Sequence, residues 1–94
     1  MAAYVIGEVD ILKPDIIKRY SGMVAAAVDK YGGRYLARGA TPQVLEGGPA
    51  HRILVIEFPS VEQAQRWFQS PEYAEAKAVR QGASNLRLIL IEGK

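Results

Sequence analysis

Cysteine is absent from this chain, and histidine occurs once, at His51. The lack of cysteine excludes disulfides, thiolate nucleophiles and Cys-ligated zinc or iron–sulfur sites. A zinc site, a serine triad or a haem would each have to depend on His51, which lies in a glycine- and proline-rich turn and is expected to be an exposed loop residue. No carboxylates show metal-ligand spacing. We therefore expect neither a metal nor a cofactor.

The chain also has little excess of charge of either sign. Twelve Lys and Arg face ten Asp and Glu, which gives a net charge of +2 and no strong field to hold a polyanion. The glycine pairs at 32–33 and 47–48 lack the lysine and the spacing of a phosphate loop, so they are expected to be turns. Glu8 and Asp10 come before any apolar run reaches the length of a signal peptide or a membrane span. We expect a soluble cytoplasmic protein that binds neither nucleic acid nor membrane.

What the chain does contain is enough for one domain, residues 1–94, with a regular alternation of strand and helix patterns. Pro14 suits a first helical turn, and Ser60 with Gln63 and Ser70 with Pro71 are typical helix starts. Gly39 is expected to end or bulge the second strand. The expected elements are strand 4–12, helix 14–31, strand 34–38, strand 52–58, helices 60–68 and 70–80, and strand 86–92, with part of a further strand allowed at 44–45.

This βαββαβ order predicts an α+β domain with a four-stranded antiparallel sheet and the helices on one face. The other face of the sheet also needs cover. A strand with one solvent-exposed face alternates apolar and polar residues, but residues 53–56 and 88–91 are apolar at both odd and even positions. No element remains to cover this second face. The pattern therefore predicts a homodimer in which two sheets stack.

Several short segments carry a resemblance that spans nearly the whole chain. They are residues 3–6 (AYVI), 30–36 (KYGGRYL), 57–60 (EFPS), 70–73 (SPEY) and 80–83 (RQGA). Together they resemble a family of small bacterial proteins of unknown function in the dimeric α/β-barrel group of ferredoxin-like folds. The resemblance implies the ferredoxin-like fold, the homodimer and a pocket between sheet and helices. It implies no established reaction and no catalytic residue, and the wider group serves several chemistries, so function does not follow from the fold.

One set of candidate residues comes from strand parity. If the β-branched odd-numbered residues of the first strand face the helices, then Tyr4, Glu8 and Asp10 face away, and Glu57 and Arg87 are expected to join them. This set has two interpretations. It is either a partly buried ion-pair network that fixes the register of the dimer, or a ligand site in which Glu57 acts as a general base. A bulge of one residue would reverse the face of any member.

A second set lies where the family resemblance concentrates: Tyr35, Arg38, Tyr73 and Arg80. Arginine and tyrosine side chains together can bind a carboxylate or a phenolate, so these are candidate ligand-binding residues. In the alternative, Tyr73 packs its helix against the sheet with its hydroxyl satisfied, and Arg80 caps the carbonyl end of that helix. Trp67 is expected to be a core wedge between helix and sheet.

Two functions that share this element order are disfavoured. The strand 52–58 is aliphatic where RNA-recognition modules need base-stacking aromatics, and the glycine-rich anion loop of acylphosphatases is missing after the first strand. Our hypothesis is a homodimer that binds or transforms a small organic molecule without metal or cofactor. The alternative is a non-enzymatic interaction or regulatory domain with no ligand site. The sequence does not decide whether the protein is an enzyme.

Overall fold

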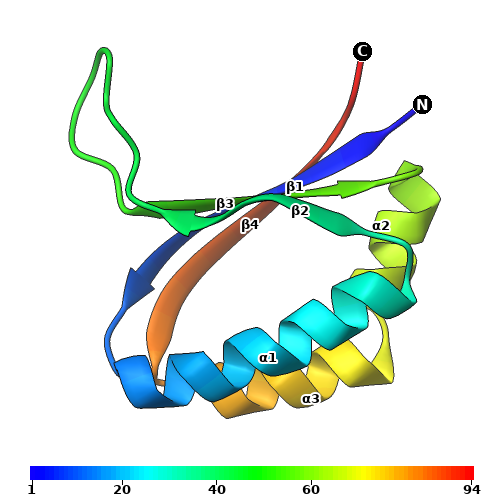
Figure 1. The fold of residues 1–94 in the computed structure, drawn as a ribbon, viewed down its shortest axis with the longest axis horizontal. Helices are drawn as coiled ribbons and strands as arrows, with labels where there is room; N and C mark the ends of the chain where they lie inside the picture. The colour runs from blue at the N-terminus through cyan, green and yellow to red at the C-terminus, as the bar shows by residue number, and fades with distance from the viewer.

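The strands of the computed structural model, which describes residues 1–94, form one antiparallel sheet in the order β2-β3-β1-β4. The helices all lie on one face of this sheet, the inner face, as Figure 1 shows. The elements are β1 (Ala3–Ile11), α1 (Pro14–Lys30), β2 (Arg34–Ala40), β3 (Arg52–Phe58), α2 (Val61–Phe68), α3 (Pro71–Arg80) and β4 (Ser84–Glu92). The predicted βαββαβ fold is therefore confirmed. No helix combines the length and the apolar character that crossing a bilayer requires.

The element boundaries follow local signals that the sequence carries. The Oγ of Ser60 accepts a hydrogen bond from the backbone N–H of Gln63 at 3.1 Å, and the Oγ of Ser70 accepts one from the backbone N–H of Tyr73 at 3.0 Å. Both predicted helix caps are thus present. The prediction of part of a strand at 44–45 is wrong, because residues 41–51 form no strand. They extend from the sheet as a long hairpin connection (Figure 1).

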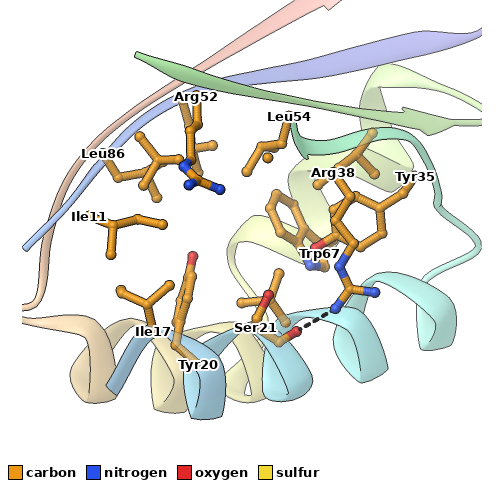
Figure 2. A pocket seen from close by; sticks show the side chains of 15 residues that line it. Ile11, Ile17, Tyr20, Ser21, Tyr35, Arg38, Arg52, Leu54, Trp67 and Leu86 are labelled. Carbon is orange, nitrogen blue, oxygen red and sulfur yellow. Dashed lines mark hydrogen bonds between the residues drawn. The ribbon is translucent and has the colours of Figure 1, made fainter. Parts of the chain in front are cut away.

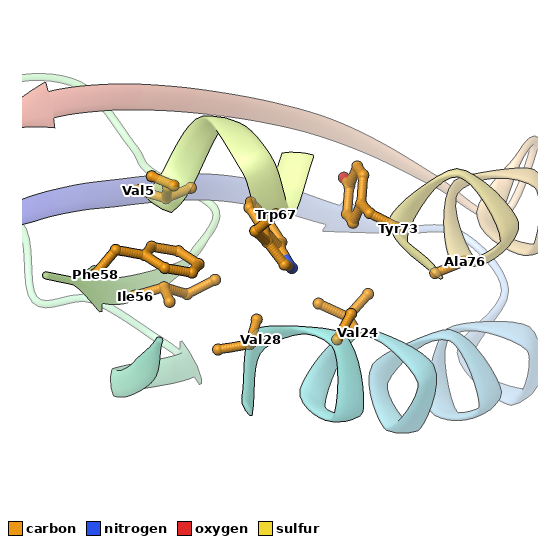
Figure 3. Packing of buried hydrophobic residues seen from close by; sticks show 10 residues of the cluster. Val5, Val24, Val28, Ile56, Phe58, Trp67, Tyr73 and Ala76 are labelled. Carbon is orange, nitrogen blue, oxygen red and sulfur yellow. The ribbon is translucent and has the colours of Figure 1, made fainter. Parts of the chain in front are cut away.

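The hydrophobic core lies between the inner face and the helices (Figure 3). Trp67 is 1% exposed, and its ring centroid lies 5.4 Å from that of Phe58 on β3 and 4.6 Å from that of Tyr73 on α3. The predicted wedge between helix and sheet is therefore what Trp67 forms. Ser70 tightens the corner between α2 and α3, because its hydroxyl donates to the carbonyl of Trp67 at 2.7 Å.

Strand β2 is irregular, and this irregularity decides which side chains reach the inner face. Its pairing with β3 shifts between Tyr35 and Ala37 and again between Arg38 and Ala40. In a regular strand, residues 35 and 38 would face opposite sides of the sheet. The shift around Leu36 instead leaves Tyr35 opposite Ile56 and Arg38 opposite Leu54, so both belong to the inner face.

The opposite side of the sheet, the outer face, is uncovered by any element of the chain (Figure 1). Its register is as the parity predicted, since Tyr4 pairs with Glu57 and Glu8 pairs with Arg87. The large apolar residues that the register places on this face are Tyr4, Ile6, Ile53, Val55, Ile89 and Ile91. Ile91 is 53% exposed and Ile89 is 44% exposed, which are large exposed fractions for such side chains.

Candidate functional site

A cavity of about 220 Å³ lies between α1 and the inner face of the sheet (Figure 2). Most of its wall is aliphatic, contributed by Val9, Ile11, Ile17, Leu54, Leu86 and Leu88. A dry cavity of about 150 Å³ in another protein holds a benzene molecule, whereas pockets for drug-sized ligands occupy about 300 Å³ or more. The space therefore suits a molecule of about one ring with a few substituents.

Polar groups enter this cavity from three elements: Tyr20 from α1, Tyr35 and Arg38 from β2, and Arg52 from β3. Figure 2 shows the Tyr20 hydroxyl and the Arg52 guanidinium pointing toward each other across the space. The guanidinium of Arg38 lies 4.8 Å from the ring centroid of Tyr35, and its Nη2 donates to the carbonyl of Ser21 at 3.2 Å. Arg38 is thereby held between β2 and α1.

The cavity continues into an open depression between the first half of α1 and the ends of β2 and β3. The two spaces share Val9, Ile11, Ile17, Ser21, Arg38 and Arg52, so the arginines stand at the mouth of the cavity. The depression adds Lys18, Asp10 and His51. The Nδ1 of His51 is 4.0 Å from the Oδ1 of Asp10. Lys18, Arg38 and Arg52 form no ion pair with a carboxylate.

The tyrosines of the cavity keep their protons over a wide pH range. Burial is the main cause that raises the pKa of Tyr20, and the nearby Tyr73 hydroxyl raises that pKa further. Burial also raises the pKa of Tyr35, although Arg38 opposes this shift. At neutral pH both phenols are therefore hydrogen-bond donors rather than bases.

Some buried polar atoms around the cavity have no partner. The Nε1 of Trp67, which lines the cavity, makes no hydrogen bond. Behind the cavity wall, the hydroxyl of Tyr73 and the Nε of Arg80 are also unpaired. Because an unmet buried donor costs stability, such atoms are expected at sites where a ligand or water completes the hydrogen bonding.

The second candidate set is divided by the structure. Tyr35 and Arg38 line the cavity, whereas Tyr73 and Arg80 do not. Tyr73 is 1% exposed and packs on Trp67, but the partner expected for its hydroxyl is missing. Arg80 lies with its guanidinium 5.8 Å from the ring centroid of Tyr20. It therefore supports a residue of the cavity instead of touching the space itself.

The structure divides the first candidate set as well. Asp10, near the end of β1, lines the open depression. Tyr4, Glu8, Glu57 and Arg87 lie on the outer face, where the sheet separates them from the cavity. Glu57 accepts a hydrogen bond from the Nε of Arg34 at 2.7 Å, on the neighbouring strand. Arg87 pairs with Glu8 in the register of β1 and β4. Parity thus placed these residues on one face, but it did not identify Arg34 as the partner of Glu57.

Sequence reasoning also missed Arg52 and the cavity role of Tyr20. The helical spacing of apolar residues in 14–31 predicts that Tyr20 packs against the sheet, but does not predict a cavity there. Arg52 stands on the same strand parity as Leu54, Ile56 and Phe58, so a charged residue begins the inward-facing side of an apolar strand. The sequence shows this charge, and a charged residue at an inward-facing position near a strand end is expected to border a cavity or a partner.

No three histidine, aspartate or glutamate side chains gather closely enough in this chain to hold a metal ion. A β2-β3-β1-β4 antiparallel sheet with its helices on one face defines a ferredoxin-like α+β domain. Within this class, the chain belongs to the DUF1330 family, a domain of unknown function, whose model matches residues 2–94.

Solved structures share the fold at low sequence identity. A protein of unknown function from Rhodopseudomonas palustris has a TM-score of 0.79 at 19% identity, over 99% of this chain and 82% of that one. A dimeric ferredoxin-like protein of unknown function from Jannaschia sp. CCS1 has a TM-score of 0.77 at 8% identity, over 99% and 100%. SnoaB, a cofactor-independent oxygenase from Streptomyces nogalater, has a TM-score of 0.72 at 9% identity, over 99% and 93%. Among functionally curated proteins, none matches this chain.

Proposed function

We propose that this protein binds a small organic molecule, about one ring in size, in the cavity between α1 and the sheet. The observation that carries the proposal is an apolar space of about 220 Å³ with two arginines at its mouth and two phenols in its wall. Apolar concave sites with a few convergent polar groups are the usual form of small-molecule sites. The unpaired Nε1 of Trp67 supports the same conclusion, since a bound molecule can supply the missing acceptor.

Binding is better supported than general-base catalysis. The cavity lining contains no carboxylate and no imidazole. Burial raises the pKa of Tyr20 and Tyr35, so both phenols stay protonated at neutral pH and neither is available to take up a proton. Glu57 remains a candidate base only for a separate site on the outer face. Transformation of a ligand in the cavity, without metal or cofactor, therefore requires a substrate that is reactive in itself.

We also propose that the protein works as a homodimer joined through the outer face. The support is a sheet surface with Ile6, Val55 and Ile89 at adjacent positions of three strands and no element above them. Large exposed apolar patches are typical of interaction surfaces, and sheet-on-sheet packing suits a two-fold dimer. The Jannaschia protein with this fold is described as dimeric. A cytoplasmic location stays a prediction from the sequence.

The uncovered outer face also supports the second candidate function, a non-enzymatic interaction or regulatory domain without a ligand site. In that case the face would serve assembly alone, and the cavity would be a packing defect. The two functions differ in what the cavity does when a molecule of fitting size is offered.

A thermal-shift experiment with one-ring probes tests the proposed function. Phenol, toluene and benzoate are added to the wild type and to Leu86→Phe, which adds a ring at the cavity wall. A probe at ten times its Kd stabilises the wild type by about 1.4 kcal/mol, which raises Tm by about 5–10 °C for a domain of this size. The rise should be smaller for Leu86→Phe. A folded wild type whose Tm no one-ring probe changes would contradict ligand binding and favour the second function.

A further inference from the structure

Arg38 and Arg52 form a pair of unneutralised cations at the mouth of the cavity. Arg38 lies opposite Leu54 in the β2–β3 pairing, and Arg52 is the next inward-facing residue of β3 toward its start. The two arginines are therefore diagonal neighbours on the inner face, within reach of long side chains. Figure 2 shows the guanidinium of Arg38 turned to Ser21 and that of Arg52 turned toward Tyr20, so Arg52 has to swing toward Arg38 to share a ligand with it. Both line the cavity and the open depression outside it.

These guanidinium groups have donors to spare. Arg38 uses Nη2 for the carbonyl of Ser21 and rests on the ring of Tyr35, which fixes its direction. A guanidinium carries five N–H donors, so most of those on Arg38 and Arg52 are free for an acceptor. The one carboxylate of the depression, Asp10, lies 4.0 Å from the Nδ1 of His51 and forms no ion pair with either arginine. A planar anion can therefore be held by two arginines here without displacing a protein partner.

The inner end of the cavity offers a different kind of donor. Trp67 is 1% exposed, and its Nε1 has no hydrogen-bond partner. Its nitrogen points toward α1 in Figure 3, and Val24, on the facing side of α1, also lines the cavity. A neutral N–H in a largely apolar surrounding can donate to an uncharged or weakly charged oxygen, and such a contact would satisfy the unpaired donor.

We propose that the ligand is a one-ring organic acid with a second oxygen at the end of the ring opposite its carboxylate. The carboxylate binds Arg38 and Arg52 at the mouth, the ring lies against the aliphatic wall, and the second oxygen accepts from the Nε1 of Trp67. This inference rests on the proposed function, since it names the class of molecule that the same cavity binds.

The experiment is isothermal titration with three probes that differ at one end each: 4-hydroxybenzoate, benzoate and 4-hydroxybenzyl alcohol. In the wild type, 4-hydroxybenzoate should bind about tenfold more tightly than the alcohol, the effect of one charge-assisted contact, and several-fold more tightly than benzoate. In Arg38→Gln and Arg52→Gln, the preference for the acid over the alcohol should fall, while the affinity for the alcohol stays near the wild-type value. Arg66→Gln, an exposed arginine on α2, is the matched control and should keep the preference.

Two results overturn this assignment. One is equal affinity of the wild type for 4-hydroxybenzoate and the alcohol, or a preference for the acid that survives in the Arg38→Gln, Arg52→Gln double variant. The other is benzoate binding as tightly as 4-hydroxybenzoate, which removes Trp67 as the partner of a second oxygen. In both cases the proposed function stands, because one-ring probes still bind. Failure of every probe to bind the folded wild type is the separate result that ends the proposed function as well.

Discussion

The Nε of Arg34 lies 2.7 Å from the Oε1 of Glu57 across neighbouring strands, on the side of the sheet away from the cavity. Glu57 is only 23% exposed, whereas Arg34 is 71% exposed, so the pair borders the apolar outer face instead of standing in free solvent. In the proposed dimer, an ion pair at this position would help to set the register of the two sheets. Four predictions follow from the two faces of the sheet, the helix contacts and the cavity wall.

Placing a lysine in the middle of the outer face should separate the dimer. Val55 pairs with Ile6, and Ile6 pairs with Ile89, so Val55→Lys buries a charge at the centre of the proposed interface. Light scattering at micromolar concentration should give a dimer for the wild type and a monomer for the variant. Ala26→Lys, on an exposed position of α1, is the control and should remain dimeric. A monomeric wild type would contradict the proposed dimer.

Removing the charge of Glu57 should affect assembly and leave ligand binding unchanged. In Glu57→Gln, the loss of a partly exposed ion pair should change the free energy of unfolding by less than about 1 kcal/mol. Dimer dissociation, followed by dilution in analytical ultracentrifugation, should become easier. The affinity for benzoate should not change, because the sheet separates Glu57 from the cavity. A loss of benzoate binding with an intact dimer would instead make Glu57 a site residue.

Acid should weaken the contact between α1 and α3. Glu72 accepts hydrogen bonds from Lys30 and, at 2.9 Å, from the Tyr31 hydroxyl. The contact with Lys30 is the largest cause that lowers the pKa of Glu72 from 4.5 to about 2. Because the folded-state pKa is below the unfolded one, the contribution of Glu72 to stability is present above pH 4.5 and is lost as the pH falls toward 2.

Urea denaturation at a series of pH values checks this contact. Between pH 4.5 and 2, the free energy of unfolding of the wild type should fall more steeply than that of Glu72→Gln. Glu75→Gln, on an exposed position of the same helix, provides the comparison and should follow the wild type. Parallel curves for the wild type and Glu72→Gln would show that the contact does not form in solution.

A methyl group on Gly7 should shrink the cavity. A Cβ at this position of β1 would lie 2.8 Å from the Cγ of Leu54 and 3.0 Å from the Cδ2 of Leu88, and both leucines line the cavity. Gly7→Ala should therefore lower stability by about 1–3 kcal/mol through overpacking and weaken the binding of one-ring probes. Gly22→Ala, where a Cβ meets nothing within 4 Å, should instead stabilise α1 by about 0.5–1 kcal/mol. Unchanged probe affinity in Gly7→Ala would show that these leucines do not limit the space.

The fold could be predicted from the sequence because its signals are local. Ser60 and Ser70 begin their helices through contacts three residues away, and the apolar runs of β3 and β4 show by themselves that both faces of the sheet need cover. The cavity could be predicted only in part. Tyr35 and Arg38 reach one face because β2 slips against β3, and such a slip depends on how two distant segments pair. The role of Tyr20 likewise depends on what packs opposite its helix.

The alternation of side chains along the central strands gives this small domain an evolutionary freedom. In β1, Val9 belongs to the cavity and Glu8 to the outer face, and in β3 the same holds for Leu54 and Val55. Neighbouring residues in the chain thus face opposite sides of the sheet, where different contacts can constrain them. If the proposed ligand site and the proposed dimer are correct, substitutions on one parity of these strands would change the cavity without touching the dimer interface, so ligand choice and assembly could diverge independently.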